Sequence, residues 1–264
     1  MGRHITVATL NLKKGDLRWG ERAPLLMDEL VRLRPDVVGF QEVDLRLDQG
    51  NWLCRRFNDL IYGGTGPGEH DPMYEIHHMA NLRDNVALEA LAIMTGLAVS
   101  RHEGMAYLIR NRVAHRITID AGGSPVDFYN THFHHELDAQ GDEWRRLQAE
   151  RLLEWMDRDG RNAPKVLVGD FNSPPGTGPI RILGERLVSA HALVHGREPH
   201  HTLTPMASIL QGQEPPEGLV VDYIFVTPNV KALQAGVFCD APDPPDPTLY
   251  PSDHLGVYAT IELD

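Results

Sequence analysis

The segment 169–175, Gly-Asp-Phe-Asn-Ser-Pro-Pro, constrains the fold of this chain more than any other stretch of its sequence. It follows the apolar run 164–168, which has the composition of a buried strand, and its two prolines require that strand to end. Because side chains alternate between the two faces of a strand, we expect Asp170 and Asn172 to point the same way and Phe171 to enter the core. Taken alone, the segment favours a turn in which both polar side chains bind backbone amides, although the same pair suits a metal or a phosphate.

Other apolar runs of the chain also carry a polar side chain inside or at the end of a predicted strand. A buried polar group is costly without a partner, so these side chains need one another or a ligand. The full set is Asn11, Glu42, Glu89, His132, Asp170, Asn172, Asp222, Asp253 and His254.

The chemistry of this set is narrow, because it consists of carboxylates, amides and imidazoles without a thiol. Hard oxygen donors favour Mg²⁺ or Mn²⁺ over zinc. A hard cation together with amides and histidines serves the hydrolysis of a phosphate ester. Strand ends that meet at one place therefore predict a phosphoesterase site.

Helical spacing of apolar residues predicts helices at 21–34, 51–60, 139–159 and 179–187. In the third of these, Arg145 is assigned to the solvated face. Strands outnumber helices and do not alternate with them strictly, which favours two packed sheets flanked by helices within one domain, residues 1–264.

Composition limits the partners and the compartment. The 264 residues carry a formal net charge of −12, which disfavours nucleic acid as a partner held by a broad basic surface. The two cysteines, Cys54 and Cys239, show no metal or redox spacing, and the sequence contains neither a signal peptide nor an apolar run of membrane-spanning length. We expect a cytoplasmic protein, without a membrane span, and a monomer.

The segment 62–84 is rich in Gly, His and Met and is predicted to be a loop. Its histidines, His70, His77 and His78, are interpreted as solvated rather than as metal ligands. Because loops carry specificity, substrate contact is the expected role of this segment. Two further loops are predicted at 192–218 and 240–251.

Six short motifs in order give the chain a family resemblance. The sequence resembles the endonuclease/exonuclease/phosphatase superfamily, which includes deoxyribonuclease-type nucleases, sphingomyelinases and inositol-polyphosphate phosphatases. The resemblance covers residues 4–263 and implies a four-layered α/β (α+β) sandwich, with two central, mostly antiparallel sheets between helices. The motifs are Thr9-Leu10-Asn11, Gln41-Glu42, Thr131-His132, Gly169-Asp170-Phe171-Asn172, Asp222-Tyr223-Ile224 and Ser252-Asp253-His254.

The resemblance implies a metal group and a water-activating group. Glu42 is similar to the main metal carboxylate of the family, and Asn11 and Asp253 are expected near the same Mg²⁺ or Mn²⁺. Asp170 and Asn172 resemble the pair that handles the attacking water and the phosphate oxygens.

The histidines have implied roles as well. His254 resembles the residue that activates water or holds the phosphate, and Asp222 would orient it. Whether Asp170 or His254 takes the proton is open. His132 resembles the histidine that assists near the leaving group, with Glu89 supporting it, although the segment 89–95 departs from the family's glycine and serine-arginine pattern.

The expected activity is Mg²⁺-dependent hydrolysis of a small-molecule or lipid-like phosphoester, by a phosphodiesterase or a phosphatase. The alternatives are a metal-dependent nuclease acting on DNA or RNA, and a catalytically silent binding module. The repair-endonuclease branch is disfavoured, because it places a tyrosine-bearing segment where this chain has Asn130-Thr131-His132. Silent relatives lose a metal carboxylate or a catalytic histidine, whereas here every expected position is filled.

Overall fold

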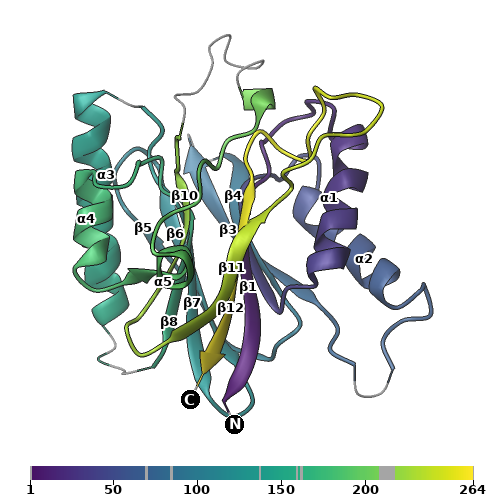
Figure 1. Ribbon diagram of the computed structural model, residues 1–264, viewed down its shortest axis with the longest axis horizontal. Helices are drawn as coiled ribbons and strands as arrows, with labels where there is room; N and C mark the ends of the chain where they lie inside the picture. Colours follow the sequence, from purple (N-terminus) through teal and green to yellow (C-terminus); the bar gives the residue numbers. More distant parts are fainter. Residues whose placement is uncertain are drawn as a thin grey trace.

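The computed structural model describes residues 2–68, 71–83, 86–136, 138–158, 160, 163–207 and 218–263. In these residues two six-stranded sheets lie face to face, and helices cover both outer faces (Figure 1). The strand orders are β11-β12-β1-β2-β4-β3 and β5-β6-β7-β8-β10-β9. Each sheet contains one parallel pair, β1–β2 or β7–β8, and its other pairs are antiparallel, which confirms the predicted sandwich of mostly antiparallel sheets.

The strands of the two sheets have the following bounds. The first sheet contains β1 (Arg3–Asn11), β2 (Val37–Asp44), β3 (Glu75–Arg83), β4 (Val86–Thr95), β11 (Lys231–Phe238) and β12 (Gly256–Leu263). The second contains β5 (Val99–Ala106), β6 (Val113–Asp120), β7 (Pro125–His132), β8 (Lys165–Asp170), β9 (Val188–Ser189) and β10 (Asp222–Val226).

Three apolar clusters hold four layers together. One cluster lies between the sheets and draws on both, as with Val7 of β1 and Phe128 of β7. A second joins the outer face of the first sheet to α1 (Trp19–Leu33) and α2 (Gln49–Ile61). The third joins the outer face of the second sheet to α3 (Ala139–Asp157) and α4 (Gly178–Gly184). The short α5 (Ala190–His195) packs on β10 and β11.

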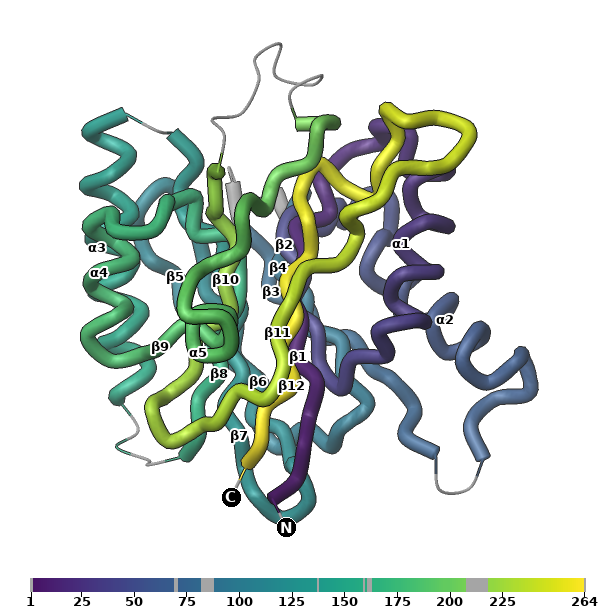
Figure 2. The backbone as a smooth tube through the Cα atoms, in the orientation of Figure 1, coloured from purple at the N-terminus to yellow at the C-terminus, as the bar shows by residue number. Residues whose placement is uncertain are grey.

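The inner faces of the strands change from apolar to polar along their length. On β1 the alternation places Ile5 and Val7 in the core between the sheets, and then Thr9 and Asn11 on the same face. Strands β7 and β8 repeat this change and finish with His132 and Asp170 at the same end of the sandwich, and the antiparallel β10 begins there with Asp222. That end lies away from both termini, which lie side by side where β1 begins and β12 ends (Figure 2).

A buried layer of hydrogen bonds joins the two sheets next to this polar end. The Gln41 side-chain amide donates to Thr9 Oγ1 at 2.9 Å and to Asn130 Oδ1 of the opposite sheet at 2.7 Å. Asn130 in turn donates to the carbonyl oxygens of Phe40 and Ala92. Because these buried groups bind one another across both sheets, the layer fixes how the sheets sit on one another; among the described residues only Gln41 Oε1 of this layer has no hydrogen-bond partner.

The structure corrects the sequence-based expectations for the segment 62–84 and for Arg145. The predicted loop 62–84 contains β3, an edge strand that pairs along its length with β4 and carries His77 and His78; His70 lies outside the described residues. Arg145 is not on a solvated face, because it is buried and donates to the carbonyl oxygens of His134 and Glu136.

Candidate functional site

The polar end of the sandwich contains a chain of three buried, hydrogen-bonding side chains. The antiparallel pairing of β8 with β10 sets Asp170 opposite Asp222. Asp222 Oδ2 lies 2.9 Å from His254 Nδ1, and His254 Nε2 lies 3.9 Å from Asp170 Oδ2. Within the described part of the chain, this is the one group of three acidic, histidine or cysteine ligand atoms that lie within 4.8 Å of one another, so it could hold a metal ion.

Burial and the charge of Asp222 shift the pKa of Asp170 in the same direction and the pKa of His254 in opposite directions. Burial, reinforced by the Asp222 carboxylate, raises the pKa of Asp170 to about 7. Burial also pushes the pKa of His254 down, but the neighbouring carboxylates, Asp222 first, outweigh it and hold that pKa well above its ordinary value. The arrangement therefore favours a charged imidazolium that bridges two acids.

The Asp170 carboxylate accepts hydrogen bonds both from the turn that follows β8 and from a side chain of the site. The strand ends at Asp170, and Asn172 takes a left-handed backbone conformation with φ of 48°, so strand alternation does not extend to it. The Asn172 N–H donates to Asp170 Oδ1 at 2.9 Å, and its side-chain amide donates to the Phe133 carbonyl. The other oxygen, Asp170 Oδ2, accepts from Asn11 Nδ2 at 3.0 Å. The turn and the site are thus built from the same residues.

Glu42 occupies an irregular position of β2. The register between β2 and β4 shifts between Phe40 and Val43, and Glu42 has a φ of 53°, a strained value for a residue with a side chain. Its Oε1 lies 3.4 Å from Asn11 Nδ2, and its Oε2 accepts the Lys14 N–H at 3.2 Å. In the described residues this carboxylate forms no ion pair, which leaves it available to a cation.

Asp253 is connected to the same region through Ser252. The Ser252 hydroxyl lies 2.6 Å from the Asn11 carbonyl oxygen and 3.3 Å from Asp253 Oδ1. Lys13 Nζ lies 3.5 Å from Asp253 Oδ2, so a metal would share this acid with a lysine. Asn11, Glu42 and Asp253 offer only oxygen ligands, which fit a hard divalent cation.

His132 ends β7 and approaches Asp170 from the opposite side to His254. Its Nε2 lies 3.4 Å from Asp170 Oδ2, and its Nδ1 lies 2.9 Å from Arg112 Nη1. Because a guanidinium can only donate, Nδ1 accepts and the ring proton sits on Nε2, toward Asp170. Burial, and next the Arg112 charge, hold the pKa of His132 well below its usual range, so the ring is neutral.

Arg112 is a residue that the sequence analysis missed. It separates Glu89 from His132: Glu89 Oε1 lies 3.4 Å from Arg112 Nη1 and 3.9 Å from His132 Nδ1. Lys14 Nζ also pairs with Glu89, at 2.6 Å. The register of β6 with β7, in which Ala114 lies opposite Thr131, is the signal that places Arg112 beside His132.

Comparison with known proteins decides the family. The sequence model of the Endonuclease/Exonuclease/phosphatase family matches residues 8–254. The chain belongs to this family. Members of the endonuclease/exonuclease/phosphatase family are metal-dependent phosphoester hydrolases, as the site chemistry predicted.

Individual relatives of this family are distant. Nocturnin from Rattus norvegicus is 29% identical over 164 residues, which cover 60% of this chain and 37% of Nocturnin. The mannosyl-6-phosphatase Bt3783 of Bacteroides thetaiotaomicron has a TM-score of 0.76 at 19% identity and covers 97% of this chain and 99% of its own. TDP2 of D. rerio, in a complex with a single-strand DNA product, has a TM-score of 0.75 at 17% identity. The match covers 98% of this chain and 99% of the TDP2 chain. At these identities, the two structures show the shared fold. Among the described residues, no helix has the length and apolarity needed to cross a membrane.

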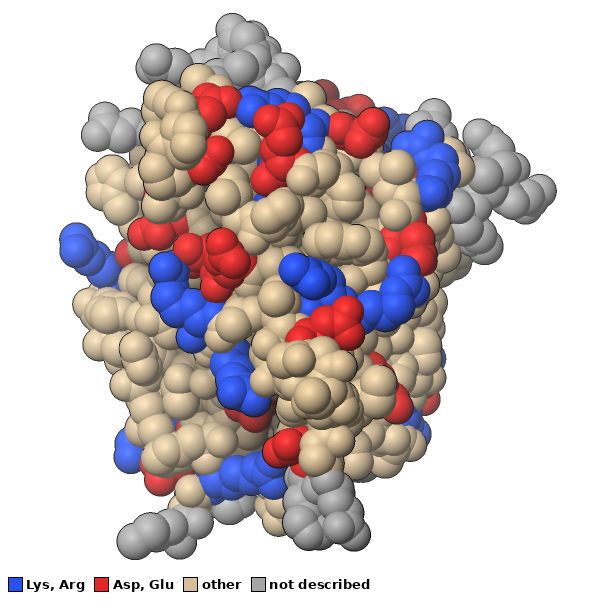
Figure 3. All heavy atoms as spheres, turned by 90° about the vertical axis from the view of Figure 1, so that its right-hand side faces the viewer, with Lys and Arg blue, Asp and Glu red and all other residues tan. Residues whose placement is uncertain are grey.

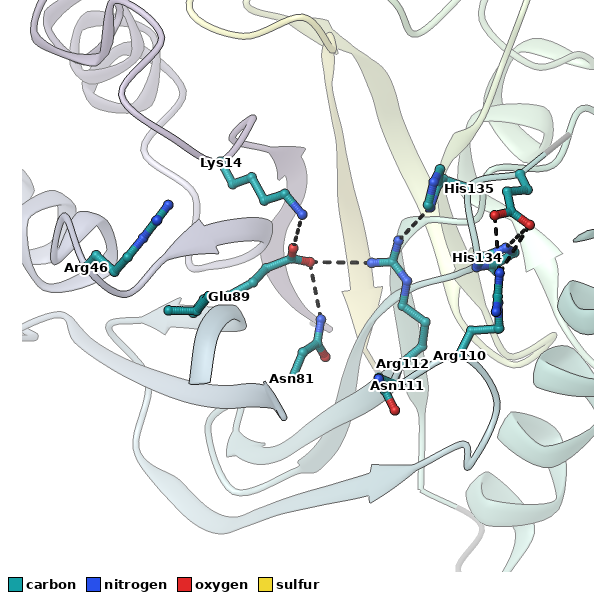
Figure 4. Close-up of a pocket in the computed structure, with 11 residues that line it drawn as sticks. Lys14, Arg46, Asn81, Glu89, Arg110, Asn111, Arg112, His134 and His135 are labelled. Atoms are coloured by element: carbon teal, nitrogen blue, oxygen red, sulfur yellow. Dashed lines mark hydrogen bonds and ion pairs between the residues drawn. The ribbon is translucent and has the colours of Figure 1, made fainter. Parts of the chain in front are cut away.

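A cavity of about 490 Å³ opens beside Glu89 and Arg112 in this family member (Figure 4). Charged and polar side chains dominate its wall, and Arg112 and Glu89 form part of it. The lining residues are Lys14, Arg46, Asn81, Leu88, Glu89, Arg110, Asn111, Arg112, His134, His135 and Glu136.

Proposed function

We propose that this endonuclease/exonuclease/phosphatase family member hydrolyses a phosphoester bond with the help of Mg²⁺ or Mn²⁺, and that its substrate is a small-molecule or lipid-like phosphoester. The observation that carries the proposal is the position of the Asp170 carboxylate. Its Oδ2 lies 3.4 Å from His132 Nε2 and 3.9 Å from His254 Nε2, and it accepts a hydrogen bond from Asn11 Nδ2, which also lies 3.4 Å from Glu42 Oε1. We also propose that residues 1–264 act as one domain; the cytoplasmic location and the monomeric state stay predictions.

We assign the metal to Glu42 and Asn11, with Asp253 nearby. A divalent cation held there would neutralise the charge that develops on the phosphate oxygens. The strained backbone of Glu42 and the lack of an ion pair at its carboxylate, within the described residues, support this assignment over the Asp170–Asp222–His254 group. In that group the closest contact, between His254 and Asp222, already has the geometry of a hydrogen bond.

In the proposed reaction, the oxygen of a water attacks phosphorus in line with the leaving alcohol. We assign Asp170 as the base that takes the water proton, because a pKa of about 7 suits proton transfer near neutral pH. His254, kept charged by Asp222, and the His132 Nε2–H would donate hydrogen bonds to the phosphate oxygens, His132 on the leaving-group side. Asn172 would complete this set of donors beside the phosphate.

The first test is the activity of two variants. Glu42→Gln and His254→Ala should each lower kcat by about three orders of magnitude or more, because each removes a charge next to the reacting phosphate. Release of the alcohol from aryl phosphates and aryl phosphodiesters with Mg²⁺, Mn²⁺ or EDTA measures this. Glu143→Gln, at an exposed acid of α3, is the matched control. Near-normal turnover in either variant, with an unchanged melting temperature, would contradict the role assigned to that residue.

A nuclease is the second candidate, because the similar TDP2 structure contains single-strand DNA. The net charge of −12 disfavours it, and the face that carries α1 and α2 mixes cationic and anionic side chains without a broad basic area (Figure 3). Cleavage of DNA or RNA that weakens steeply with added salt would promote this candidate. No cleavage at low salt with Mg²⁺ would remove it.

A further inference from the structure

The cavity beside the site is positively charged in a strongly acidic protein. Its wall contains four cationic side chains, Lys14, Arg46, Arg110 and Arg112, against the two carboxylates of Glu89 and Glu136. Outside the wall, Arg46 pairs with Asp44 and the Lys14 N–H binds Glu42. The lining side chains themselves carry four positive charges and two negative ones, and such a wall in a chain of net charge −12 can bind an anionic group.

The turn between β5 and β6 presents much of this charge in an unusual backbone conformation. Leu108, Arg110 and Asn111 have φ values of 57°, 54° and 55°, in the left-handed region that residues with side chains rarely adopt. Arg110, Asn111 and Arg112 all line the cavity. Strained backbone of this kind persists only where the surroundings enforce it, and it gathers at ligand-binding sites.

The surroundings of this turn hold it rigidly. The Tyr107 hydroxyl lies 2.7 Å from Thr131 Oγ1, and Gln148 of α3 donates to the Ile109 carbonyl at 3.4 Å. The Arg110 guanidinium lies over the Trp144 ring at 4.1 Å from its centroid. A stacked guanidinium loses less side-chain entropy when it binds an anion, so the Arg110 side chain is preorganised for anion binding.

The turn is also connected to the proposed reaction centre. Arg112 Nη1 contacts His132 Nδ1. Arg112 Nη2 lies 3.4 Å from His135 Nδ1, as Figure 4 shows. An occupant of the cavity therefore lies next to the phosphate that His132 would contact. No aromatic ring other than imidazole is among the described lining residues, so the cavity offers no stacking surface of Trp, Tyr or Phe to a nucleobase.

We propose that the substrate is a small, polar phosphoester that carries a second phosphate group, and that the turn 108–112 binds this second group through Arg110 and Asn111. This inference rests on the proposed hydrolysis at the neighbouring site. Arginine suits the role because its planar donors match two phosphate oxygens at once. Glu136 lies 3.2 Å from Arg110 and competes with the phosphate for it.

The test compares substrates that differ only in the second phosphate. Release of inorganic phosphate is measured for alkanediol bisphosphates of two to six carbons and for alkyl monophosphates of the same lengths. At one or more lengths, kcat/KM for the bisphosphate should exceed that for the monophosphate by about 10- to 100-fold. Equal values at every length would overturn the inference while leaving the proposed hydrolysis intact.

Variants of Arg110 and of its ion-pair partner Glu136 test whether Arg110 causes the preference for the bisphosphate. Arg110→Gln should raise KM for the preferred bisphosphate by about tenfold or more, and Arg110→Lys, which keeps the charge but loses the planar fork, by less. Glu136→Gln should lower that KM because it frees Arg110. KM for the monophosphate should change much less than KM for the bisphosphate in each of them. Arg146→Gln, on the exposed side of α3 and outside the cavity, is the matched control.

Calorimetric titration of the same bisphosphates and monophosphates, with Mg²⁺, gives a readout that does not depend on turnover. If no compound is hydrolysed, the proposed hydrolysis of phosphomonoesters fails, and selective binding of a bisphosphate that Arg110→Gln weakens still supports the second-phosphate site. Equal binding of both classes, or equal loss of both in Arg110→Gln, contradicts it.

Discussion

Among single residues, Gly169 shows how closely β7 and β8 approach each other beside Asp170. It has a φ of +149°, and a Cβ at this position would lie 2.0 Å from the Thr131 carbonyl oxygen. Gly169→Ala should lower the free energy of unfolding by about 2–4 kcal/mol, because both the conformation and the contact oppose a side chain. Urea denaturation followed by circular dichroism measures this.

The control for that substitution is Gly20→Ala in α1, where an added Cβ meets open space. Since alanine favours a helix over glycine, this variant should be unchanged or more stable by up to about 1 kcal/mol. Equal stability of the Gly169 variant and the wild type would show that β7 and β8 can move apart.

The charge of Asp222 is a second property of one residue that can be tested. Asp222→Asn keeps the shape and removes the carboxylate that outweighs the effect of burial on His254. We expect kcat to fall by about two to four orders of magnitude with KM little changed, because the imidazole loses its charge and its orientation. Asp157→Asn, at an exposed acid that pairs with Arg186, is the control. Activity within tenfold of the wild type would mean that His254 works without the carboxylate.

The sequence was sufficient to single out the acids and histidines that the structure brings together at the candidate site, because each is a polar residue inside or at the end of an apolar run. Arg112 could not be singled out in the same way. Its importance comes from the pairing of β6 with β7, which sets it beside His132, and an arginine just before a strand looks like any solvated residue. The same limit applies to Arg145, whose partners are backbone carbonyls of a neighbouring segment.

Among the elements, the strands without an apolar run in the sequence share one property. The apolar runs, which predict the other strands, are 4–12, 36–42, 85–95, 112–120, 126–133, 164–168, 219–226 and 255–263. The strands β3, β5, β9 and β11 are the four edges of the two sheets. The central strands are covered on both faces and therefore read as apolar runs, whereas an edge strand such as β5 alternates between exposed and half-buried residues. Edge strands are stabilised by pairing with a neighbouring strand, and the residues of an edge strand alone do not show which strand that is.

Two of these edges meet at a cluster of histidines. His77 of β3 lies beside His102 of β5, and His102 beside His115 of β6, with ring centroids 5.2 and 4.9 Å apart. Neither ring nitrogen of the buried His115 has a hydrogen-bond partner among the described residues. Burial, and then the neighbouring histidines, lower the pKa of His77 and lower that of His115 strongly.

The cluster makes stability depend on pH. Above about pH 6.5 these histidines are neutral in both the folded and the unfolded chain. Below that pH the unfolded chain binds protons that the folded cluster resists, so stability should fall as the pH is lowered from about 6.5. Melting temperatures measured from pH 8 to pH 5 should show this fall, and His115→Gln should make it shallower. An identical pH dependence in this variant and in the control His4→Gln would exclude the cluster as its origin.

For the whole molecule, binding of a metal should appear as stability even without a substrate. A cation that binds only the folded chain stabilises it by about 2.7 kcal/mol at a hundred times its Kd. The melting temperature should therefore rise with MgCl₂ and return to its starting value with EDTA. Glu42→Gln should lose most of this rise, whereas Glu143→Gln should keep it. An equal rise in the Glu42 variant would place the metal elsewhere, with the Asp170–Asp222–His254 group as the next candidate.

The pairing of the first and last strands also determines how the molecule responds to force. Arg3 lies opposite Leu263 in an antiparallel pair, so β1 begins and β12 finishes at the same end of the sheet. Hydrogen bonds between antiparallel strands run across the strands, and pulling the two ends apart loads them one pair at a time. The β1–β12 ladder would open like a zipper instead of shearing as a unit. The site lies at the opposite end of both strands, so the β1–β12 hydrogen bonds nearest to it would break last.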